Sequence, residues 1–469
     1  MPAKCCNIPH EIQFPIRLSP RRVADIHFRR KSSSPRKRLG HRRRRCVPPD
    51  AVVWPKSTAD VATVLSTANS RGIPVTPYAA GTSLEGHSVP VHGGISLNMM
   101  KMDSVLDVRP DDFQIDVQPG VLGGAINDTV EQYGLFFPPL PSSGDISTIG
   151  GMIANDASGM QTVKYGEVHD WILRLEAVLP DGTIIETGTN AAKTSAGYNL
   201  LDLLVGSEGT LAVVTEATLE LAGLPEQIWG GRVTFDTVGD ASAFTSDVIR
   251  WGVDIAKIEL LDRSSVKMSN EHLDADLEER PMVFVEFHTN HSVKDEVEFF
   301  ESVVDQHPVV DYTVGESGKE MEELWKVREE MATALKNYDP EMAILASGDV
   351  TVPVSSYADL VRYISSLEDE YNLEIPCFGH AGDGNIHYTI FVRKDNHRQH
   401  AAGERADRDI VERAIDLGGT CTGEHGIGMG KKQHLTSEYN SETIDLMRRV
   451  KDDFDPNGIL NPGKIFTDP

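Results

Sequence analysis

The sequence predicts an α+β protein with two folded domains, and three observations lead to this prediction. First, 469 residues with 40% hydrophobic content are enough to bury more than one core. Second, residues 47–224 are rich in glycine and in short apolar runs, which suits an α+β architecture. Third, strand-like and helical runs alternate after Gly223, which is typical of split βαβ units and predicts a ferredoxin-like sheet with helices on one face.

In the first half of the chain, helix-capping residues and turn residues predict where the helices and strands begin and end. Ser57 or Thr58 is expected to cap a helix that continues to about Ser70, and Gly72 ends it before an apolar strand that reaches Pro77. The further elements expected here are a helix at about 122–133, a hairpin with its turn at 180–182, and a strand pair within 209–221.

The second half alternates strands with helices. The expected strands are "GRVTF", "IAKIELL", "MVFVEFH", "VDYTV" and "AILASGDVTVPV". The expected helices lie near 238–251, 292–306, 318–337 and 355–371, and a glycine-rich loop, a helix near 441–454 and an extended tail close the chain.

Composition excludes several classes of protein. No apolar run approaches the ~18 residues that a membrane-spanning helix needs. The five cysteines show no CxxC spacing, which argues against a zinc knuckle, an iron–sulfur cluster and a disulfide framework, and favours a reducing compartment.

Charge is distributed unevenly along the chain. Residues 1–46 hold 14 Lys and Arg against 2 Asp and Glu, whereas the other 423 residues hold 31 against 69. The acidic body resembles the surface of a halophile protein and argues against a nucleic-acid partner. The basic head has three interpretations, which are a transit peptide, a disordered basic arm, and a stretch translated out of frame.

Three glycine-containing stretches in the first half are typical of ligand-binding backbone. "PYAAGTSLEGH" (77–87) follows a strand and can turn N–H donors toward a phosphate, although its spacing is not GxGxxG. Residues 138–170 string small hydrogen-bonding residues together, which suits an extended polar ligand, and "GSEGTLAVVT" (206–215) opens directly into an apolar strand.

These stretches, in this order, resemble the flavin-binding half of the vanillyl-alcohol-oxidase-type FAD oxidoreductases. With "GHAGDGNIH", "GGTCTGEHGIG" and "FDPNGILNPGKIF", the chain resembles the family of D-lactate dehydrogenase (cytochrome) and glycolate oxidase over about 47–469. The resemblance implies a PCMH-type FAD-binding domain of two subdomains, a ferredoxin-like cap, and a C-terminal segment that returns to the flavin domain. The implied divisions are an atypical head at 1–46, the FAD-binding domain at 47–224, the cap at 225–420, and the catalytic loop and tail at 421–469.

The same resemblance implies which residues bind FAD, which is expected to be non-covalent, with a covalent link at His87 as the less favoured alternative. Gly81, Thr82 and Ser83 are expected on the pyrophosphate. The other implied contacts are Ser147, Gly150, Gly151 and Asn155 along the dinucleotide, Glu208, Gly209 and Val213 near the adenine, and Asn461 near the flavin.

A metal site is the sharper interpretation of "CFGHAGDGNIHYTIF" (377–391). His380 and His387 flank a tight Gly-Asp-Gly turn, and Glu424 stands beside His425 inside glycines. Two imidazoles and one carboxylate suit Zn²⁺, with Mn²⁺ or Fe²⁺ as alternatives. The resemblance implies that His380, His387 and Glu424 are the ligands and that His425 is the catalytic base.

The substrate implied by the resemblance is a small 2-hydroxy acid. Arg328 is expected to bind its carboxylate, and Asn385 to orient it. Family members that act on longer diacids such as D-2-hydroxyglutarate carry a threonine and a lysine where this chain has Ala332 and Ser347, which favours lactate or glycolate.

The electron acceptor stays open at this point. A cytochrome, a quinone, an electron-transfer flavoprotein or, in an oxidase, oxygen would each suit the chemistry, and a non-catalytic flavin subunit of a larger complex is a further hypothesis. Peripheral membrane association and a homodimer are both compatible with the sequence and stay open as well. The location is expected to be the cytoplasm or the inner membrane surface, or the mitochondrion if the basic head is a transit peptide.

Overall fold

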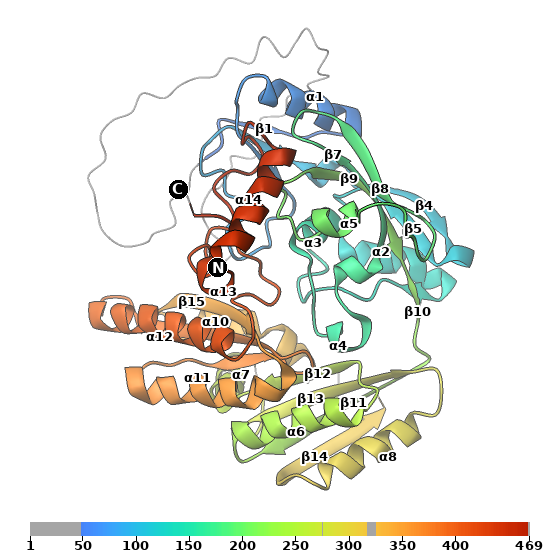
Figure 1. Cartoon of the computed structure of the whole chain (residues 1–469). Coiled ribbons are helices and arrows are strands. Elements are labelled where there is room, and N and C mark those ends of the chain that lie inside the picture. Colours follow the sequence, from blue (N-terminus) through green and yellow to red (C-terminus); the bar gives the residue numbers. More distant parts are fainter. Residues whose placement is uncertain (1–47, 274, 317–324, 468–469) are drawn as a thin grey trace.

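The computed structural model describes residues 48–273, 275–316 and 325–467, and within them the chain forms two domains (Figure 1). The basic head and the first part of the helix expected at 318–337 lie outside these described residues. The N-terminal domain comprises two subdomains, and the cap domain lies below it in the view of Figure 1.

A small parallel sheet in the order β1-β3-β2 forms the first subdomain. Its helix α1 begins after Ser57, whose hydroxyl accepts the backbone N–H of Asp60 at 3.2 Å, so the predicted cap is confirmed. The bounds are β1 (Ala51–Val53), α1 (Thr58–Asn69), β2 (Val75–Tyr78) and β3 (Ile95–Asn98).

The C-terminal segment completes this subdomain. The carbonyl of Ile459 accepts the N–H of Val75 at 2.7 Å, and the N–H of Asn461 donates to the carbonyl of Val75 at 2.7 Å. Leu460 is fully buried in the same core as α1. The predicted return of the tail to the N-terminal domain is therefore confirmed.

The second subdomain is a five-stranded antiparallel sheet in the order β4-β5-β9-β7-β8, and β6 pairs with β10 beside it. The hairpin of β7 and β8 turns at Gly182, whose φ is +91°, as the Pro-Asp-Gly sequence predicts. The strands are β4 (Val105–Arg109), β5 (Gln114–Val117), β6 (Leu135–Phe136), β7 (Ile172–Val178), β8 (Ile184–Gly188), β9 (Val213–Glu220) and β10 (Ala222–Gly223). The helices are α2 (Gly123–Val130), α3 (Ile149–Asn155), α4 (Thr162–Tyr165) and α5 (Leu200–Leu204).

The cap is a seven-stranded antiparallel sheet in the order β14-β11-β13-β12-β16-β17-β15. Its strands are β11 (Gln227–Phe235), β12 (Lys257–Leu261), β13 (Met282–Thr289), β14 (Val309–Glu316), β15 (Met342–Thr351), β16 (Cys377–His380) and β17 (Asn385–Arg393). One face carries α6 (Val238–Trp251), α8 (Val293–Val304), α11 (Tyr357–Tyr371) and α12 (His397–Asp416), which lie side by side in Figure 1. The strand and helix order agrees with the expected ferredoxin-like sheet, but the helices are not confined to one face, since α7 (Arg263–His272) and α10 (Met331–Asn337) pack on the other face against Leu261, Met282 and Phe284.

The two faces of the cap sheet differ in chemistry because strand side chains alternate. On β12, Ile258 and Leu260 point into the core beneath the four helices, whereas Lys257 and Glu259 point to the opposite face. In the sheet register, Glu259 lies opposite His380 on β16. On this second face, the buried charge of Glu259 lies beside buried apolar residues such as Leu261 and Phe284.

The remaining helices are α7 (Arg263–His272), α10 (Met331–Asn337), α13 (Leu435–Glu438) and α14 (Ser441–Phe454). The helix expected at 318–337 is interrupted at Glu330, so Arg328 lies in a separate helical stretch at 325–329. The twenty-residue helix α12 is the clearest omission from the sequence-based elements.

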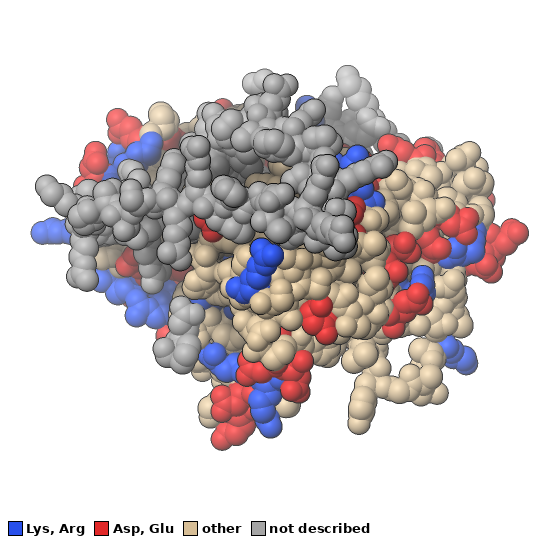
Figure 2. Space-filling view, turned by 90° about the horizontal axis from the view of Figure 1, so that it is seen from above, with Lys and Arg blue, Asp and Glu red and all other residues tan. Residues whose placement is uncertain are grey.

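The described part of the chain holds no helix with the length and apolar character to span a bilayer. Figure 2, which views the molecule from above, shows acidic and basic side chains together on that face. The halophile-like acidic surface stays a prediction.

Candidate active site

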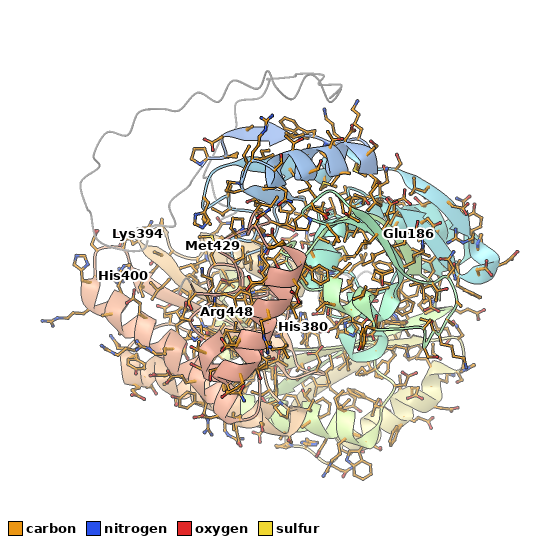
Figure 3. The ribbon with its side chains drawn as sticks, turned by 45° about the horizontal axis from the view of Figure 1, so that its top comes forward. Glu186, His380, Lys394, His400, Met429 and Arg448 are labelled. Atoms are coloured by element: carbon orange, nitrogen blue, oxygen red, sulfur yellow. The ribbon has the colours of Figure 1, made fainter. Side chains whose placement is uncertain are left out.

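A histidine pair and a glutamate converge where the two domains meet. His380 ends β16 and His387 lies in β17, and their ring centroids are 5.2 Å apart. Glu424, which is distant in sequence, brings its Oε1 to 3.1 Å from Nε2 of His387 and 3.7 Å from Nε2 of His380. Figure 3 shows His380 near the centre of the molecule.

The turn between the two histidines depends on its glycines. A Cβ at Gly384, whose φ is +81°, would overlap the carbonyl oxygen of Val352. A Cβ at Gly382 would lie 2.6 Å from side-chain carbons of both Ile258 and Val163. Val163 belongs to the N-terminal domain, so Gly382 permits that domain to approach the turn closely.

The three side chains fit a divalent metal ion. Two atoms that each lie about 2.1 Å from one ion are about 3.0–3.4 Å apart in tetrahedral or octahedral geometry. The distance from Glu424 Oε1 to His387 Nε2, 3.1 Å, lies in this range, that to His380 Nε2, 3.7 Å, is slightly longer, and all three side chains offer one ligand atom within 4.8 Å of the others. Nitrogen and oxygen ligands of this kind suit Zn²⁺, Mn²⁺ and Fe²⁺.

His425 lies against this triad. Its ring stacks on His387 with centroids 5.2 Å apart and an interplanar angle of 16°. Nε2 of His425 faces the triad, 3.8 Å from Glu424 Oε1, while Nδ1 lies 4.0 Å from Asp349 Oδ2. Burial lowers the pKa of His425 to about 4, which keeps the imidazole neutral at pH 7.

Asp349 organises the loop that carries Glu424 and His425. Its fully buried carboxylate accepts the backbone N–H groups of Gly423, Glu424 and His425 through Oδ2 at 2.9, 3.0 and 2.9 Å. Burial raises the pKa of Asp349, but the charge of Lys431 and these hydrogen bonds hold it well below its usual range. The sequence placed this aspartate on a strand and gave it no role.

Glu259 is the second acidic residue without a role in the sequence-based site. It is fully buried, and its Oε1 is hydrogen-bonded to Nδ1 of His380 at 2.5 Å. Its Oε2 accepts Nε–H of Arg328 at 2.7 Å. A carboxylate in an apolar strand such as "IAKIELL" gives no sequence signal, because its partners come from segments about 70 and 120 residues away.

The two residues predicted to hold the substrate lie at this site. Arg328 is buried, and its guanidinium lies 4.8 Å from the ring centroid of Phe378. Among the described residues its Nη1 and Nη2 form no hydrogen bond, so both can receive a carboxylate. The amide nitrogen of Asn385 donates to Asp349 Oδ1 at 2.6 Å, while Asn385 Oδ1 is buried without a partner among the described residues.

The N-terminal domain contributes directly to the same site. Nδ2 of Asn155 donates to the carbonyl of Glu424 at 2.7 Å, and the hydroxyl of Ser158 donates to Glu424 Oε2 at 3.2 Å. The loop that carries Glu424 and His425 is thus held from both domains. Asn155 was predicted to line a dinucleotide, and the structure also gives it this contact with the cap.

Glu208 holds the next part of the loop. Its carboxylate accepts the N–H groups of Ile427 at 2.7 Å and Gly428 at 2.9 Å, and its backbone carbonyl accepts Nδ2 of Asn461 at 2.8 Å. Nε2 of His87 lies 3.3 Å from Glu208 Oε2. Glu208 and Asn461, predicted to contact opposite ends of FAD, therefore lie in contact with each other.

Several of the other predicted cofactor residues lie where the first two glycine stretches approach each other. The hydroxyls of Thr82 and Ser147 are hydrogen-bonded at 3.0 Å, which joins the first two glycine stretches. A Cβ at Gly151 would lie 3.1 Å from Cβ of Ala79, and one at Gly150 would lie 2.5 Å from Cβ of Pro119. The small residues and hydroxyls here fit a phosphate-bearing dinucleotide.

Ser83 and Gly81 lie in the same loop, where the hydroxyl of Ser83 is hydrogen-bonded to Nδ1 of His87 and Gly81 has a φ of +72°. Within the described chain, Nε2 of His87 is buried and forms no hydrogen bond, although the carboxylate of Glu208 lies 3.3 Å away. Gly209 follows Glu208 with a φ of +63°. Val213 pairs with Val178 in the sheet and is packed in the core beneath it.

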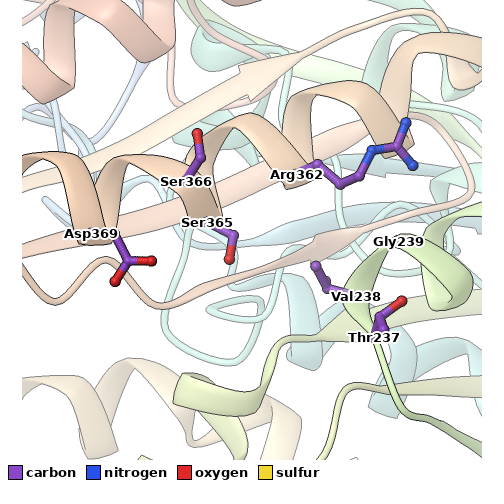
Figure 4. A pocket seen from close by; sticks show the side chains of 7 residues that line it. All are labelled: Thr237, Val238, Gly239, Arg362, Ser365, Ser366 and Asp369. Atoms are coloured by element: carbon purple, nitrogen blue, oxygen red, sulfur yellow. The ribbon is translucent and has the colours of Figure 1, made fainter.

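Two other features of the molecule do not belong to this site. A hollow of about 490 Å³ between the start of α6 and α11 is lined by Thr237, Arg362 and Asp369 among others, none of them a site residue (Figure 4). Asp156 and His169 form a second carboxylate–imidazole pair. The carboxylate of Asp156 accepts the backbone N–H of His169 and is hydrogen-bonded to its Nδ1, so local hydrogen bonds explain this pair.

Comparisons with known proteins agree with this architecture. Residues 49–188 match the family model described as "FAD binding domain", and residues 224–465 match "FAD linked oxidases, C-terminal domain". The chain is 35% identical to "D-lactate dehydrogenase [cytochrome], mitochondrial" of Arabidopsis thaliana, over 89% of this chain and 73% of the relative. It is 36% identical to "Glycolate oxidase subunit GlcD" of Bacillus subtilis (strain 168), over 89% of both chains.

Solved structures confirm the fold class. The structure of p-cresol methylhydroxylase with substrate bound superposes with a TM-score of 0.72 at 15% identity, over 89% of this chain and 88% of that one. The 4-ethylphenol oxidase of Gulosibacter chungangensis superposes with a TM-score of 0.70 at 17% identity, over 89% of both chains. At these identities the likeness shows the PCMH-type fold alone.

Proposed function

Since the chain belongs to the FAD-linked oxidase family that includes D-lactate dehydrogenases and glycolate oxidase subunits, we propose that it oxidises D-lactate or glycolate to the 2-oxo acid. The relatives that support this proposal include "Probable D-lactate dehydrogenase, mitochondrial" of Danio rerio, at 36% identity over 90% of this chain and 85% of the relative. The cofactor is FAD, since residues 49–188 match an FAD-binding domain and residues 224–465 match the C-terminal domain of FAD-linked oxidases.

One structural observation carries the proposal. His380, His387 and Glu424 each bring one ligand atom within 4.8 Å of the others, and Nε2 of His425, whose imidazole is neutral at pH 7, lies 3.8 Å from Glu424 Oε1. Arg328 offers two free guanidinium nitrogens in the described structure and is joined to His380 through one carboxylate. A 2-hydroxy acid needs these functions together, because its hydroxyl must lose a proton while its carboxylate is held in place.

The chain's own residues divide the reaction as follows. Nη1 and Nη2 of Arg328 bind the substrate carboxylate, and this fixes the position of the adjacent C–H and O–H groups. Nε2 of His425 accepts the hydroxyl proton, and the carboxylate of Asp349, 4.0 Å from Nδ1, stabilises the resulting imidazolium. The metal and FAD, when bound, would supply the remaining chemistry. A divalent cation lowers the pKa of a hydroxyl, and FAD accepts a hydride.

The finer assignments are part of the same proposal. Zn²⁺ is the preferred metal, with Mn²⁺ or Fe²⁺ as alternatives, bound by His380, His387 and Glu424. FAD is bound non-covalently. It lies between the loops that carry Gly81, Thr82, Ser83, Ser147, Gly150, Gly151 and Asn155. Electrons then pass to a cytochrome, a quinone or an electron-transfer flavoprotein. The name of the Arabidopsis relative specifies a cytochrome for that enzyme.

The experiment that tests the proposal is anaerobic reduction of the bound flavin by a panel of hydroxy acids. D-lactate or glycolate is expected to bleach the yellow protein, whereas L-lactate and D-2-hydroxyglutarate bleach it at least tenfold more slowly. A protein that takes up FAD but is bleached by none of these acids would be a non-catalytic flavin subunit. Peroxide formed with substrate in air would identify an oxidase.

A further inference from the structure

We propose that Glu259 is a positioning residue that holds the metal ligand His380 and the carboxylate-binding Arg328 at the same time. This inference rests on the proposed function, because it assigns roles to both partners of Glu259. It adds a residue that contacts neither substrate nor metal and that no motif indicates. Its consequence is that one buried carboxylate links the metal site to the substrate site.

The geometry uses both carboxylate oxygens of Glu259. Oε1 is 2.5 Å from Nδ1 of His380, and Oε2 is 2.7 Å from Nε of Arg328. A carboxylate that accepts the Nδ1–H of an imidazole fixes the tautomer, so that Nε2 carries the lone pair. In His380 that Nε2 is the atom that faces Glu424 at 3.7 Å.

The same carboxylate orients the guanidinium. Because Glu259 takes Nε–H of Arg328, the two Nη groups are left for the two oxygens of a substrate carboxylate. The plane of the guanidinium is further fixed by Phe378, whose ring centroid lies 4.8 Å away. Phe378 and His380 both belong to β16, so one short strand supports both partners of Glu259.

The position of Glu259 makes it a rigid support. The residue has no exposed surface, and β12 holds it between Phe284 on β13 and His380 on β16 in sheet register. A buried carboxylate is stable only when it is paired and hydrogen-bonded, and Glu259 has one cation and one imidazole as partners. Removal of its charge therefore changes two functional side chains and leaves the strand in place.

The chain contains a matched control on the same face of the sheet. Glu286 on β13 is also buried and also joins a cation and a histidine, since its Oε1 lies 2.8 Å from both Lys257 Nζ and His288 Nε2. None of these three residues belongs to the metal or substrate site. Glu286→Gln therefore reproduces the loss of a buried, doubly paired carboxylate without a connection to the metal ligands.

The test compares FAD-loaded Glu259→Gln and Glu286→Gln proteins by their affinity for Mn²⁺. Free Mn²⁺ is measured by electron paramagnetic resonance without any substrate, so the result does not depend on the protein's activity. Glu259→Gln is expected to raise the Mn²⁺ dissociation constant by about 10- to 100-fold, which is the effect typical of losing a partner of a metal-bound histidine. Glu286→Gln is expected to change it less than twofold, and FAD content is expected to be unchanged in both.

A second readout follows Arg328. With D-lactate as substrate, Glu259→Gln is expected to raise KM, and saturating metal is expected to restore kcat more than KM. Glu259→Asp, which keeps the charge but shortens the side chain, provides a second variant and is expected to fall between wild type and Glu259→Gln in Mn²⁺ affinity. If no hydroxy acid reduces the flavin, the Mn²⁺ result still decides the role of Glu259 toward His380.

Three outcomes would overturn the proposal. The first is a Mn²⁺ dissociation constant within twofold of wild type in Glu259→Gln. The second is an equal loss of Mn²⁺ affinity in Glu286→Gln, because the effect would then belong to any buried carboxylate of this sheet. The third is loss of FAD binding in both Glu259 variants, because the residue would then be required for the fold.

Discussion

Oδ2 of Asp349 accepts the backbone N–H of His425 at 2.9 Å, although the two residues are separated by 76 positions in the sequence. The same oxygen accepts the N–H groups of Gly423 and Glu424, so one buried carboxylate shapes the loop that carries Glu424 and His425, the proposed metal ligand and the proposed base. Charge-assisted hydrogen bonds of this kind are about twice as strong as neutral ones. The cap sheet therefore holds the backbone at His425 from the end of β15, while Asn155 and Glu208 hold the same loop from the N-terminal domain.

Asp349→Asn is expected to lower kcat by at least 100-fold, because an amide cannot accept three N–H groups and also compensate the charge of Lys431. Steady-state kinetics and the FAD content of the purified protein measure the effect. Asp116→Asn is the control, since Asp116 forms an ion pair with Arg109 in the five-stranded sheet, away from the site. An Asp349→Asn protein with wild-type kcat would contradict the proposed role.

His425→Gln is expected to reduce kcat by about 10²–10⁴-fold, the range typical of losing a general base. FAD content and metal content should both stay at the wild-type level, because His425 is assigned as neither a flavin nor a metal ligand. Single-turnover flavin reduction under anaerobic conditions is the direct measurement. A variant that reduces flavin at the wild-type rate would assign the proton transfer to another group.

Arg328→Lys is expected to raise KM for D-lactate by about 10- to 100-fold, with a smaller change in kcat. Lysine keeps the charge but cannot donate to Glu259 and to both oxygens of a substrate carboxylate together. Each charge-assisted hydrogen bond contributes about 1.5–3 kcal/mol, which gives this range. Equal KM values for Arg328→Lys and wild type would exclude Arg328 as the carboxylate-binding residue.

Stability is expected to depend on pH through Glu368, on the outer helix α11. Burial raises the pKa of Glu368 from 4.5 to about 7 in the folded protein, and its Oε1 accepts the N–H of Ile375 at 2.8 Å. Because the folded state binds this proton more tightly, the contribution to stability is complete below the unfolded pKa and is lost as pH rises through about 7.

Glu368→Gln should therefore raise the melting temperature at pH 8 and change it little at pH 5. Glutamine keeps the oxygen that accepts the N–H of Ile375 and removes the ionisable group. Thermal unfolding of both proteins at the two pH values, with FAD in excess, measures the difference. An identical shift at both pH values would show that ionisation of Glu368 is not the cause.

The parts of the site that the sequence predicted are those with a local signature. His380 and His387 could be paired because Gly382 and Gly384 make a turn that no larger residue would permit. Glu424 and His425 stand out as a charged pair among glycines. The two domains were likewise predictable from short strands, capped helices and the βαβ rhythm, whereas the return of the tail was implied by the family resemblance.

The residues that the sequence did not predict act through contacts between distant segments. Glu259 is one acidic residue in an apolar strand, and its partners lie on a helix and on another strand. Helix α12 was missed because its buried face is formed largely of alanine and glycine, such as Ala402, Gly403 and Ala406, which give weak periodicity among many charges. Its apolar character is apparent only when it packs on the sheet.

The central claim is that His380, His387 and Glu424 bind a metal that the oxidation of a 2-hydroxy acid requires. The most direct test is the rate of anaerobic flavin bleaching by D-lactate or glycolate before and after chelation, with metal content measured in each sample. The rate is expected to fall at least 100-fold on metal removal and to return when Zn²⁺, Mn²⁺ or Fe²⁺ is added, whereas His387→Ala protein stays slow throughout. Metal-free protein that bleaches at its original rate would contradict the claim.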